Sequence, residues 1–169
     1  DDLNRAISIE PSSESHSLRA AVNLRLGNSA ATLEDYNKAI ELNPKPVSLY
    51  LSRGRVFYSK KDYAAAAADY SQAIEINPES NLYFIRGDSY EKMGEIRKAV
   101  SDYQKAVELD ANNESAKNNL KRLQDELAKL PPNPQTKEAT LASETSDTPS
   151  AVNVGSLNNL AVRLATPVY

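Results

Sequence analysis

The sequence lacks cysteine altogether and contains one histidine and five glycines among its 169 residues. Without cysteine, disulfides, thiolate zinc sites and cysteine nucleophiles are excluded. A single histidine, His16, rules out a multi-histidine metal site, and we expect it to be a packed or half-exposed residue. The glycines are too sparse for a phosphate-binding loop of the G-x-G-x-x-G or G-x-x-x-x-G-K type. We therefore expect no enzyme, no cofactor and no metal site.

Strong charge and long apolar runs are missing as well. The 20 basic and 23 acidic residues leave a net charge of −3, which is not the clustered basic surface that nucleic acid requires. No apolar run approaches the roughly 20 residues that span a bilayer, so direct membrane insertion is not expected. No signal-peptide pattern is visible, and we expect a soluble protein that is cytoplasmic or organellar rather than secreted.

One hexapeptide occurs four times with small variations. The copies are D-L-N-R-A-I at Asp2–Ile7, D-Y-N-K-A-I at Asp35–Ile40, D-Y-S-Q-A-I at Asp69–Ile74 and D-Y-Q-K-A-V at Asp102–Val107. Their alanines stand at positions 6, 39, 73 and 106, so the spacing is 33, 34 and 33 residues. A second motif, written S-L-R-A, L-S-R-G and F-I-R-G, lies between the copies at the same period. Two motifs that keep one period indicate a repeat architecture.

Each repeat has the pattern of two short helices. In the second repeat, Tyr50, Gly54 and Phe57 recur at steps of four and three, as one face of a helix requires. Residues 63–76 carry a second apolar stripe of the same kind. Pro78 follows this stripe, where its missing N–H and fixed φ discourage further helix. We expect the small residues Gly54 and Gly87 to let the partner helix approach closely.

These features resemble the tetratricopeptide repeat (TPR) family. The aromatic–small–aromatic pattern of its first helix is matched by Tyr50–Gly54–Phe57 and Tyr83–Gly87–Tyr90, and the Ala–aromatic–Ala pattern of its second helix by Ala66–Tyr70–Ala73 and Ala99–Tyr103–Ala106. Pro44 and Pro78 supply the closing proline. The resemblance implies an all-α fold, an α-solenoid in which helix–turn–helix repeats form a right-handed superhelix.

The first full repeat departs from the family pattern. His16 and Asn23 stand where aromatic residues are expected, and Thr32 stands where alanine is expected. We expect this repeat to pack less well or to contact something outside this sequence.

The repeat pattern predicts a domain at residues 1–129 and a tail at 130–169. The domain comprises a half-repeat at 1–11, full repeats at about 13–46, 47–79 and 80–112, and a capping helix at 113–129. The half-repeat has no partner helix in this sequence, and we expect the native protein to extend further at its N-terminus.

The tail is rich in serine, threonine and proline, which is typical of a disordered linker. Apolar residues return near its end, and a short helix is predicted near 156–164. Two interpretations remain open, a linker and an arm ordered by docking on a neighbouring subunit or along the superhelix. The predicted docking residues are Leu157, Leu160, Val162 and Leu164.

Arginines and aspartates also recur at the repeat period. Arg19, Arg53 and Arg86 take one position in the first helices, and Asp35, Asp69 and Asp102 take one position in the second helices. We predict contacts between them within each repeat, with independent solvated charges as the alternative. An exposed pair would contribute only about 0–1 kcal/mol.

By resemblance to the family, the first helices line a concave groove that binds partners. The residues predicted to bind there are Leu24, Arg25, Leu51, Arg55, Tyr58, Phe84, Asp88 and Lys92. The apolar members would form a strip suited to a peptide or helix, unless they pack on neighbouring repeats or on the tail instead. Family members that hold a C-terminal carboxylate use Lys and Asn at set inward positions. Those positions carry Ser17, Ala21, Ser52, Asn81 and Ile85, so this activity is not predicted.

We interpret the chain as a protein–protein interaction scaffold or adaptor that binds a peptide or helix of a partner in the groove. One alternative is a structural or assembly subunit of a larger complex, tethered by the tail. A second is a regulatory TPR segment of a longer protein whose N-terminal domain is absent from this sequence.

Overall fold

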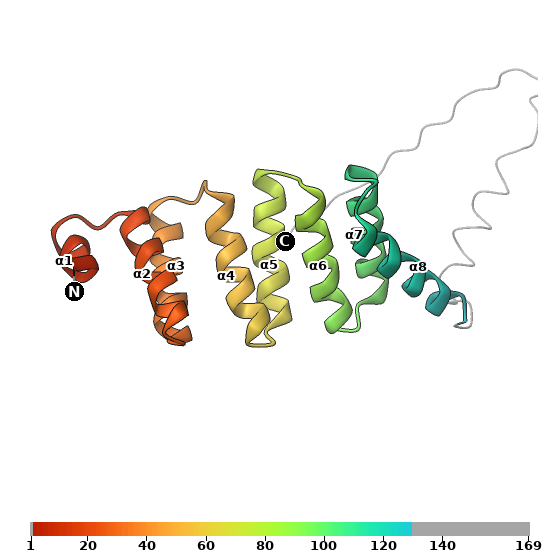
Figure 1. Ribbon diagram of the computed structural model, residues 1–169, viewed down its shortest axis with the longest axis horizontal. Coiled ribbons are helices and arrows are strands. Elements are labelled where there is room, and N and C mark those ends of the chain that lie inside the picture. Colours follow the sequence, from red (N-terminus) through yellow and green to blue (C-terminus); the bar gives the residue numbers. More distant parts are fainter. Residues whose placement is uncertain (1, 130–169) are drawn as a thin grey trace, which may run out of the picture. The chain divides into compact units, whose positions relative to one another are not determined.

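A computed structural model of the protein describes residues 2–129 as a succession of helices without strands (Figure 1). The predicted tail, its short helix and its docking residues lie outside the described residues. The helices are α1 (Asp2–Ile9), α2 (Ser13–Arg25), α3 (Ser29–Leu42), α4 (Val47–Ser59), α5 (Tyr63–Ile76), α6 (Ser80–Lys92), α7 (Ile96–Leu109) and α8 (Glu114–Ala128).

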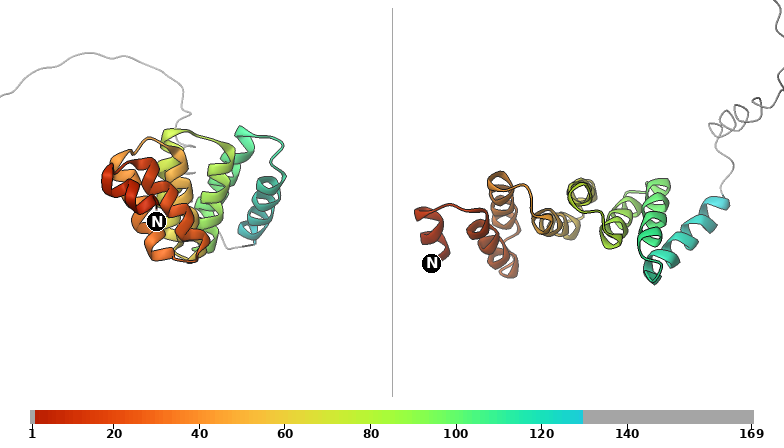
Figure 2. Two further views of the ribbon diagram at one scale, coloured as in Figure 1. Left: turned by 60° about the vertical axis from the view of Figure 1, so that its left-hand side comes forward. Right: turned by 90° about the horizontal axis from the view of Figure 1, so that it is seen from above.

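Each helix packs on its neighbours in the sequence (Figures 1 and 2). The closest pairs are α2 with α3, α4 with α5 and α6 with α7, and these hairpins are the three repeats. Between the hairpins, α3 contacts α4 and α5 contacts α6, while α1 packs on α2 and α8 packs on α7. The predicted fold class, an all-α solenoid, is confirmed.

The hairpins depend on a small residue of the first helix facing a tyrosine of the second. A Cβ atom added to Gly54 would lie 2.6 Å from Cε1 of Tyr70, and one added to Gly87 would lie 3.0 Å from Cδ1 of Tyr103. Both tyrosines are buried, so their rings have little room to give way. Glycine therefore permits the close approach of the two helices that the sequence pattern predicted.

The turn inside each hairpin requires one residue in the left-handed region. Gly27 and Gly94 occupy this position in the first and third repeats, each with φ of 77°. Lys61 occupies it in the second repeat with φ of 65°. A lysine side chain crowds the backbone in this conformation, whereas glycine does not. The second hairpin is thus closed by a strained residue.

The recurring arginines and aspartates form an ion pair within each repeat. The Nη2 atoms of Arg19, Arg53 and Arg86 lie 2.6, 2.6 and 2.7 Å from Oδ1 of Asp35, Asp69 and Asp102. In each pair the arginine Nε also donates to the carboxylate. The aspartate side chains are only 2, 6 and 7 % exposed, so the predicted contacts are confirmed and the alternative of independent solvated charges is wrong.

The same arginines also connect neighbouring repeats. Nη1 of Arg53 donates to Oδ1 of Asn37 at 2.7 Å, and Nη1 of Arg86 donates to Oγ of Ser71 at 3.0 Å. Arg19 makes the equivalent bond to Asn4 in α1 at 2.8 Å. The acceptors all stand at the third position of the repeated hexapeptide. The hexapeptide therefore supplies an aspartate to its own repeat and a polar acceptor to the next one.

The first repeat surrounds its ion pair with hydrogen bonds where the other repeats use aromatic rings. Arg53 lies over the ring of Tyr50, and Arg86 lies over the rings of Tyr83 and Tyr90. At the corresponding positions of the first repeat, His16 Nδ1 lies 3.1 Å from Oδ1 of Asp35, and Asn23 Nδ2 donates to Oδ2 at 3.2 Å.

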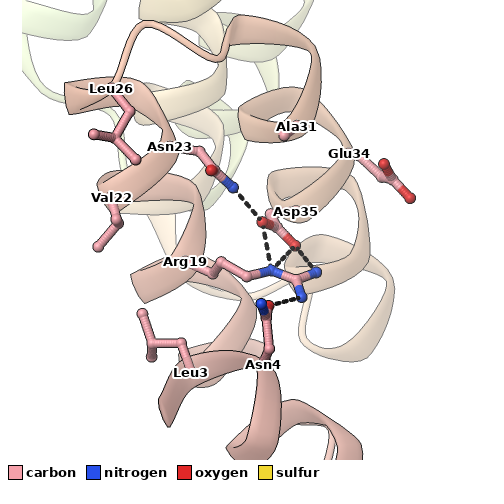
Figure 3. Close-up of a pocket in the computed structure, with 9 residues that line it drawn as sticks. All are labelled: Leu3, Asn4, Arg19, Val22, Asn23, Leu26, Ala31, Glu34 and Asp35. Carbon is pink, nitrogen blue, oxygen red and sulfur yellow. Dashed lines mark hydrogen bonds and ion pairs between the residues drawn. The ribbon is translucent and has the colours of Figure 1, made fainter. Parts of the chain in front are cut away.

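Because a carboxylate only accepts hydrogen bonds, the His16 ring carries its proton on Nδ1. Two of the residues that break the family pattern, His16 and Asn23, thus form a polar cluster around Asp35, and Figure 3 shows the bond from Asn23. His16 itself is buried, as one of the two expectations for it required.

The helix α8 repeats the register of a first helix. Ala116, Leu120 and Leu123 stand where α6 has Tyr83, Gly87 and Tyr90, and all three are buried. Leu120 and Leu123 pack with Ala99 and Tyr103 of α7. A leucine, Leu120, thus stands where α6 has the glycine that lies against the ring of Tyr103.

Changing Lys61 to glycine should stabilise the protein. The substitution removes the left-handed strain of the side chain but adds backbone freedom to the unfolded chain, for a net gain of about 0.5–1 kcal/mol. Urea denaturation followed by circular dichroism measures this difference. The matched control is Lys60→Gly, which should lower stability because Lys60 has φ of −82°. A loss of stability in both variants would contradict the strain at Lys61.

Changing Asp35 to asparagine should destabilise the protein in a pH-dependent way. Burial acts to raise the pKa of Asp35, but hydrogen bonds from Arg19 and His16 outweigh it and hold the pKa below its ordinary value. Because the pKa of Asp35 is lower in the folded protein, its carboxylate stabilises the fold at pH values above about 3.9, the pKa of an unfolded aspartate. This stabilisation is lost as the pH falls through the pKa of the folded state. At pH 7 we expect a loss of about 2–3 kcal/mol in the free energy of unfolding.

Denaturation at pH 7 and at pH 3 measures how the difference between the wild type and Asp35→Asn changes. The difference in the free energy of unfolding between the two proteins should be smaller at pH 3 than at pH 7. The control is Glu34→Gln, which alters an exposed neighbouring carboxylate and should have little effect at either pH. A difference that stays constant between the two pH values would show that the charge of Asp35 is not what stabilises the cluster.

Candidate functional site

A cavity of about 190 Å³ lies between α4, α5 and α6, and we call it the α4–α6 cavity. Its lining comprises Arg55 and Tyr58 from α4, Tyr70 from α5, and Ile85 and Asp88 from α6. The structure thus brings together three of the residues predicted to bind partners, Arg55, Tyr58 and Asp88. Tyr70 and Ile85 also line the cavity, although neither is among the residues predicted to bind partners. Tyr70 belongs to the Ala–aromatic–Ala pattern of the second helix, and Ile85 stands at one of the inward positions that carry no lysine or asparagine.

Tyr58 and Asp88 interact across one side of this cavity. The Tyr58 hydroxyl donates to Oδ2 of Asp88, and the Tyr58 ring meets the edge of Tyr63 with centroids 5.1 Å apart. Burial, together with the bond to Asp88, raises the pKa of Tyr58 well above its ordinary value. Tyr58 therefore remains a protonated donor. Within residues 2–129, the other oxygen of Asp88, Oδ1, accepts no hydrogen bond.

Tyr70 presents an unused hydroxyl to the same cavity. Its side chain is 2 % exposed, and burial raises its pKa to about 12. The positive charge of Arg55 lowers this pKa and the negative charge of Asp88 raises it, so both charges act at the Tyr70 hydroxyl. That hydroxyl forms no hydrogen bond with the part of the chain that the structure describes. Arg55 is exposed and has no ion-pair partner there.

A second cavity, of about 290 Å³, lies beside the Asp35 cluster (Figure 3). Four of its polar side chains bond to one another, since Arg19 donates to Asp35 and Asn4, and Asn23 donates to Asp35, while the fifth, Glu34, is exposed. The opposite wall consists of Leu3, Val22 and Leu26, and Val22 and Leu26 are 45 and 68 % exposed. Because its polar groups are engaged in holding the first repeat, we regard the α4–α6 cavity as the better candidate site.

The other residues predicted to bind partners lie outside both cavities. Leu51 packs against the core of Tyr50 and Leu82, and the Phe84 ring packs on Tyr103 with centroids 5.7 Å apart. Leu51 thus contacts the following repeat through Leu82, Phe84 contacts the second helix of its own repeat, and both side chains are half-buried. By contrast, Leu24 is 44 % exposed, and Arg25 and Lys92 are exposed at the C-terminal ends of α2 and α6.

Two further classes of site are absent from the described residues. Residues 2–129 contain no group of three or more histidine, aspartate and glutamate side chains placed to hold a metal ion. None of the helices α1 to α8 has the length and apolar character needed to cross a membrane.

The fold is shared with several solved structures. The first TPR domain of Spaghetti (RPAP3), bound to the HSP90 peptide SRMEEVD, aligns with a TM-score of 0.62 and 23% identity, covering 69% of this chain and 93% of that one. The second TPR domain of human RPAP3, in complex with the HSP70 peptide SGPTIEEVD, aligns with a TM-score of 0.59 and 20% identity, covering 66% and 98%. MamA aligns with a TM-score of 0.66 and 21% identity, covering 84% and 85%.

Sequence comparisons identify the repeat itself. Comparison with curated proteins gives no match. Two family models, both described as the tetratricopeptide repeat, match residues 18–81 and residues 80–113. These ranges together run from α2 to the end of the third hairpin, which is the segment where the glycine–tyrosine contacts and the Arg–Asp pairs recur. The chain belongs to the tetratricopeptide repeat family.

Proposed function

We propose that the protein is an interaction module, an adaptor or scaffold, that binds a peptide or helix of a partner protein at the α4–α6 cavity. One observation carries the proposal. The cavity gathers three polar groups that the fold does not use, namely the Arg55 guanidinium, the Tyr70 hydroxyl and Oδ1 of Asp88. Arg55 is exposed and Asp88 is half-buried, so a partner side chain that enters the cavity can reach both of these lining residues.

The peptide complexes of two similar structures support this class of function. Both peptides end in the letters E-E-V-D, so those domains bind acidic segments. The negative charge of Asp88 disfavours an acidic group in the α4–α6 cavity. Four of the five inward positions associated with carboxylate binding carry neither lysine nor asparagine, for example Ser52 and Ile85. We therefore expect this protein to bind protein segments of a different character.

Selection of peptides from a displayed random library on the whole chain tests the proposal. Affinities of selected peptides are then measured by isothermal titration calorimetry with the wild type and with Arg55→Ala and Asp88→Ala. Because each variant removes a polar group from the cavity, we expect affinity to fall about tenfold in each, which corresponds to roughly 1.4 kcal/mol.

The control for this experiment is Lys121→Ala, which removes an exposed charge on α8 and should leave affinity unchanged. Selection of no binding peptide would count against the proposal. Peptides that bind Arg55→Ala, Asp88→Ala and the wild type equally well would also count against it.

A further inference from the structure

The polar groups of the α4–α6 cavity have opposite electrostatic character. Arg55 supplies hydrogen-bond donors with a positive charge, and Asp88 supplies a free acceptor oxygen with a negative charge. The charges of Arg55 and Asp88 both influence the Tyr70 hydroxyl. Ile85 and the ring of Tyr58 make the remaining wall apolar. A group that enters this cavity therefore meets a donor side and an acceptor side at once.

This arrangement discriminates among the side chains of a partner. A lysine or arginine would pair with Asp88 but would bring a second positive charge beside Arg55. A glutamate or aspartate would pair with Arg55 but would bring a second negative charge beside Asp88. Either ion would also lose hydration on entering the cavity. A side-chain carboxamide is neutral, and it carries an acceptor oxygen and a donor nitrogen on one carbon atom.

We propose that the α4–α6 cavity binds the side-chain carboxamide of a glutamine or asparagine of the partner protein. Its oxygen accepts hydrogen bonds from Arg55 and the Tyr70 hydroxyl, and its nitrogen donates to Oδ1 of Asp88. The methylene groups of the same side chain contact Ile85 and the ring of Tyr58. This inference rests on the proposed function, because it specifies the chemistry of the ligand at the same cavity.

The third repeat shows how the chain fills the corresponding place with its own side chains. Tyr103, the counterpart of Tyr70, donates its hydroxyl to Oε2 of Glu91 at 3.0 Å. Arg122 of α8 also donates to Glu91, at 2.8 Å. In the second repeat the counterpart of Glu91 is Tyr58, whose hydroxyl is already bound to Asp88. The Tyr103 hydroxyl therefore has a hydrogen-bond acceptor within the described chain, whereas the Tyr70 hydroxyl has none there. In our proposal the ligand supplies this acceptor to Tyr70.

The first part of the test uses peptides selected on the whole 169-residue chain. The selected sequences should share glutamine or asparagine at one fixed position. Replacing that residue by alanine, glutamate or lysine should weaken binding to the wild type at least tenfold in calorimetry. Equal affinity of the glutamine, glutamate and lysine peptides would overturn the inference.

The second part exchanges groups of the cavity. Arg55→Gln removes the positive charge and should shift preference toward the lysine peptide, whereas Asp88→Asn should shift it toward the glutamate peptide. Tyr70→Phe removes only a hydroxyl and should weaken binding of the glutamine peptide about threefold to tenfold without affecting the alanine peptide. The matched control is Tyr36→Phe at the same position of the first repeat, and it should change neither affinity.

The outcomes separate this inference from the function on which it rests. If cavity variants abolish peptide binding but no carboxamide is selected, or if Tyr70→Phe has no effect, the carboxamide inference fails and the proposed function stands. If no selected peptide depends on Arg55 or Asp88, both fail. Circular dichroism of each variant confirms that a loss of binding does not arise from unfolding.

Discussion

The buried carboxylate of each second helix is the constraint on which the rest of the structure depends. An aspartate that is less than one tenth exposed cannot remain unpaired without a cost of several kcal/mol, so the arginine of the first helix must reach it. The pair fixes how the two helices of a hairpin face each other. The third arginine nitrogen then bonds to the preceding second helix, so the charge that orients one repeat also joins it to its neighbour.

The side chains around the Arg–Asp pair differ from one repeat to the next, and these differences decide whether polar groups remain unused beside it. In the first repeat, His16 and Asn23 replace aromatic rings and bond to Asp35. In the third repeat, Glu91 and Arg122 close the space beside Tyr103. The second repeat has neither of these sets of hydrogen bonds, and the hydroxyl of its Tyr58 donates to Asp88 instead. A cavity with unused polar groups remains there, and it is the site at which we propose that a partner binds.

The sequence predicted the helices, the hairpins and the ion pairs because each depends on spacing that the chain repeats. Helix periodicity, glycine opposite tyrosine and arginine opposite aspartate all recur at intervals of 33 or 34 residues. The α4–α6 cavity could not be predicted in this way, because it arises where one repeat differs from the others. The hydroxyl direction of Tyr58 and the missing acceptor for Tyr70 depend on three helices at once. Likewise, Leu51 and Phe84 fit a groove pattern, and the structure shows both of them half-buried against core residues of other helices.

A double-mutant cycle on Arg53 and Asp69 tests the central claim most directly. The free energy of unfolding is measured for the wild type, Arg53→Met, Asp69→Ala and the double variant, and for the same cycle on the exposed Lys38–Glu41 pair. We predict a coupling energy of about 1.5–3 kcal/mol for Arg53 with Asp69 and below about 0.5 kcal/mol for Lys38 with Glu41. Additive effects at Arg53 and Asp69 would contradict the account, because the hairpin would then be oriented by apolar packing alone.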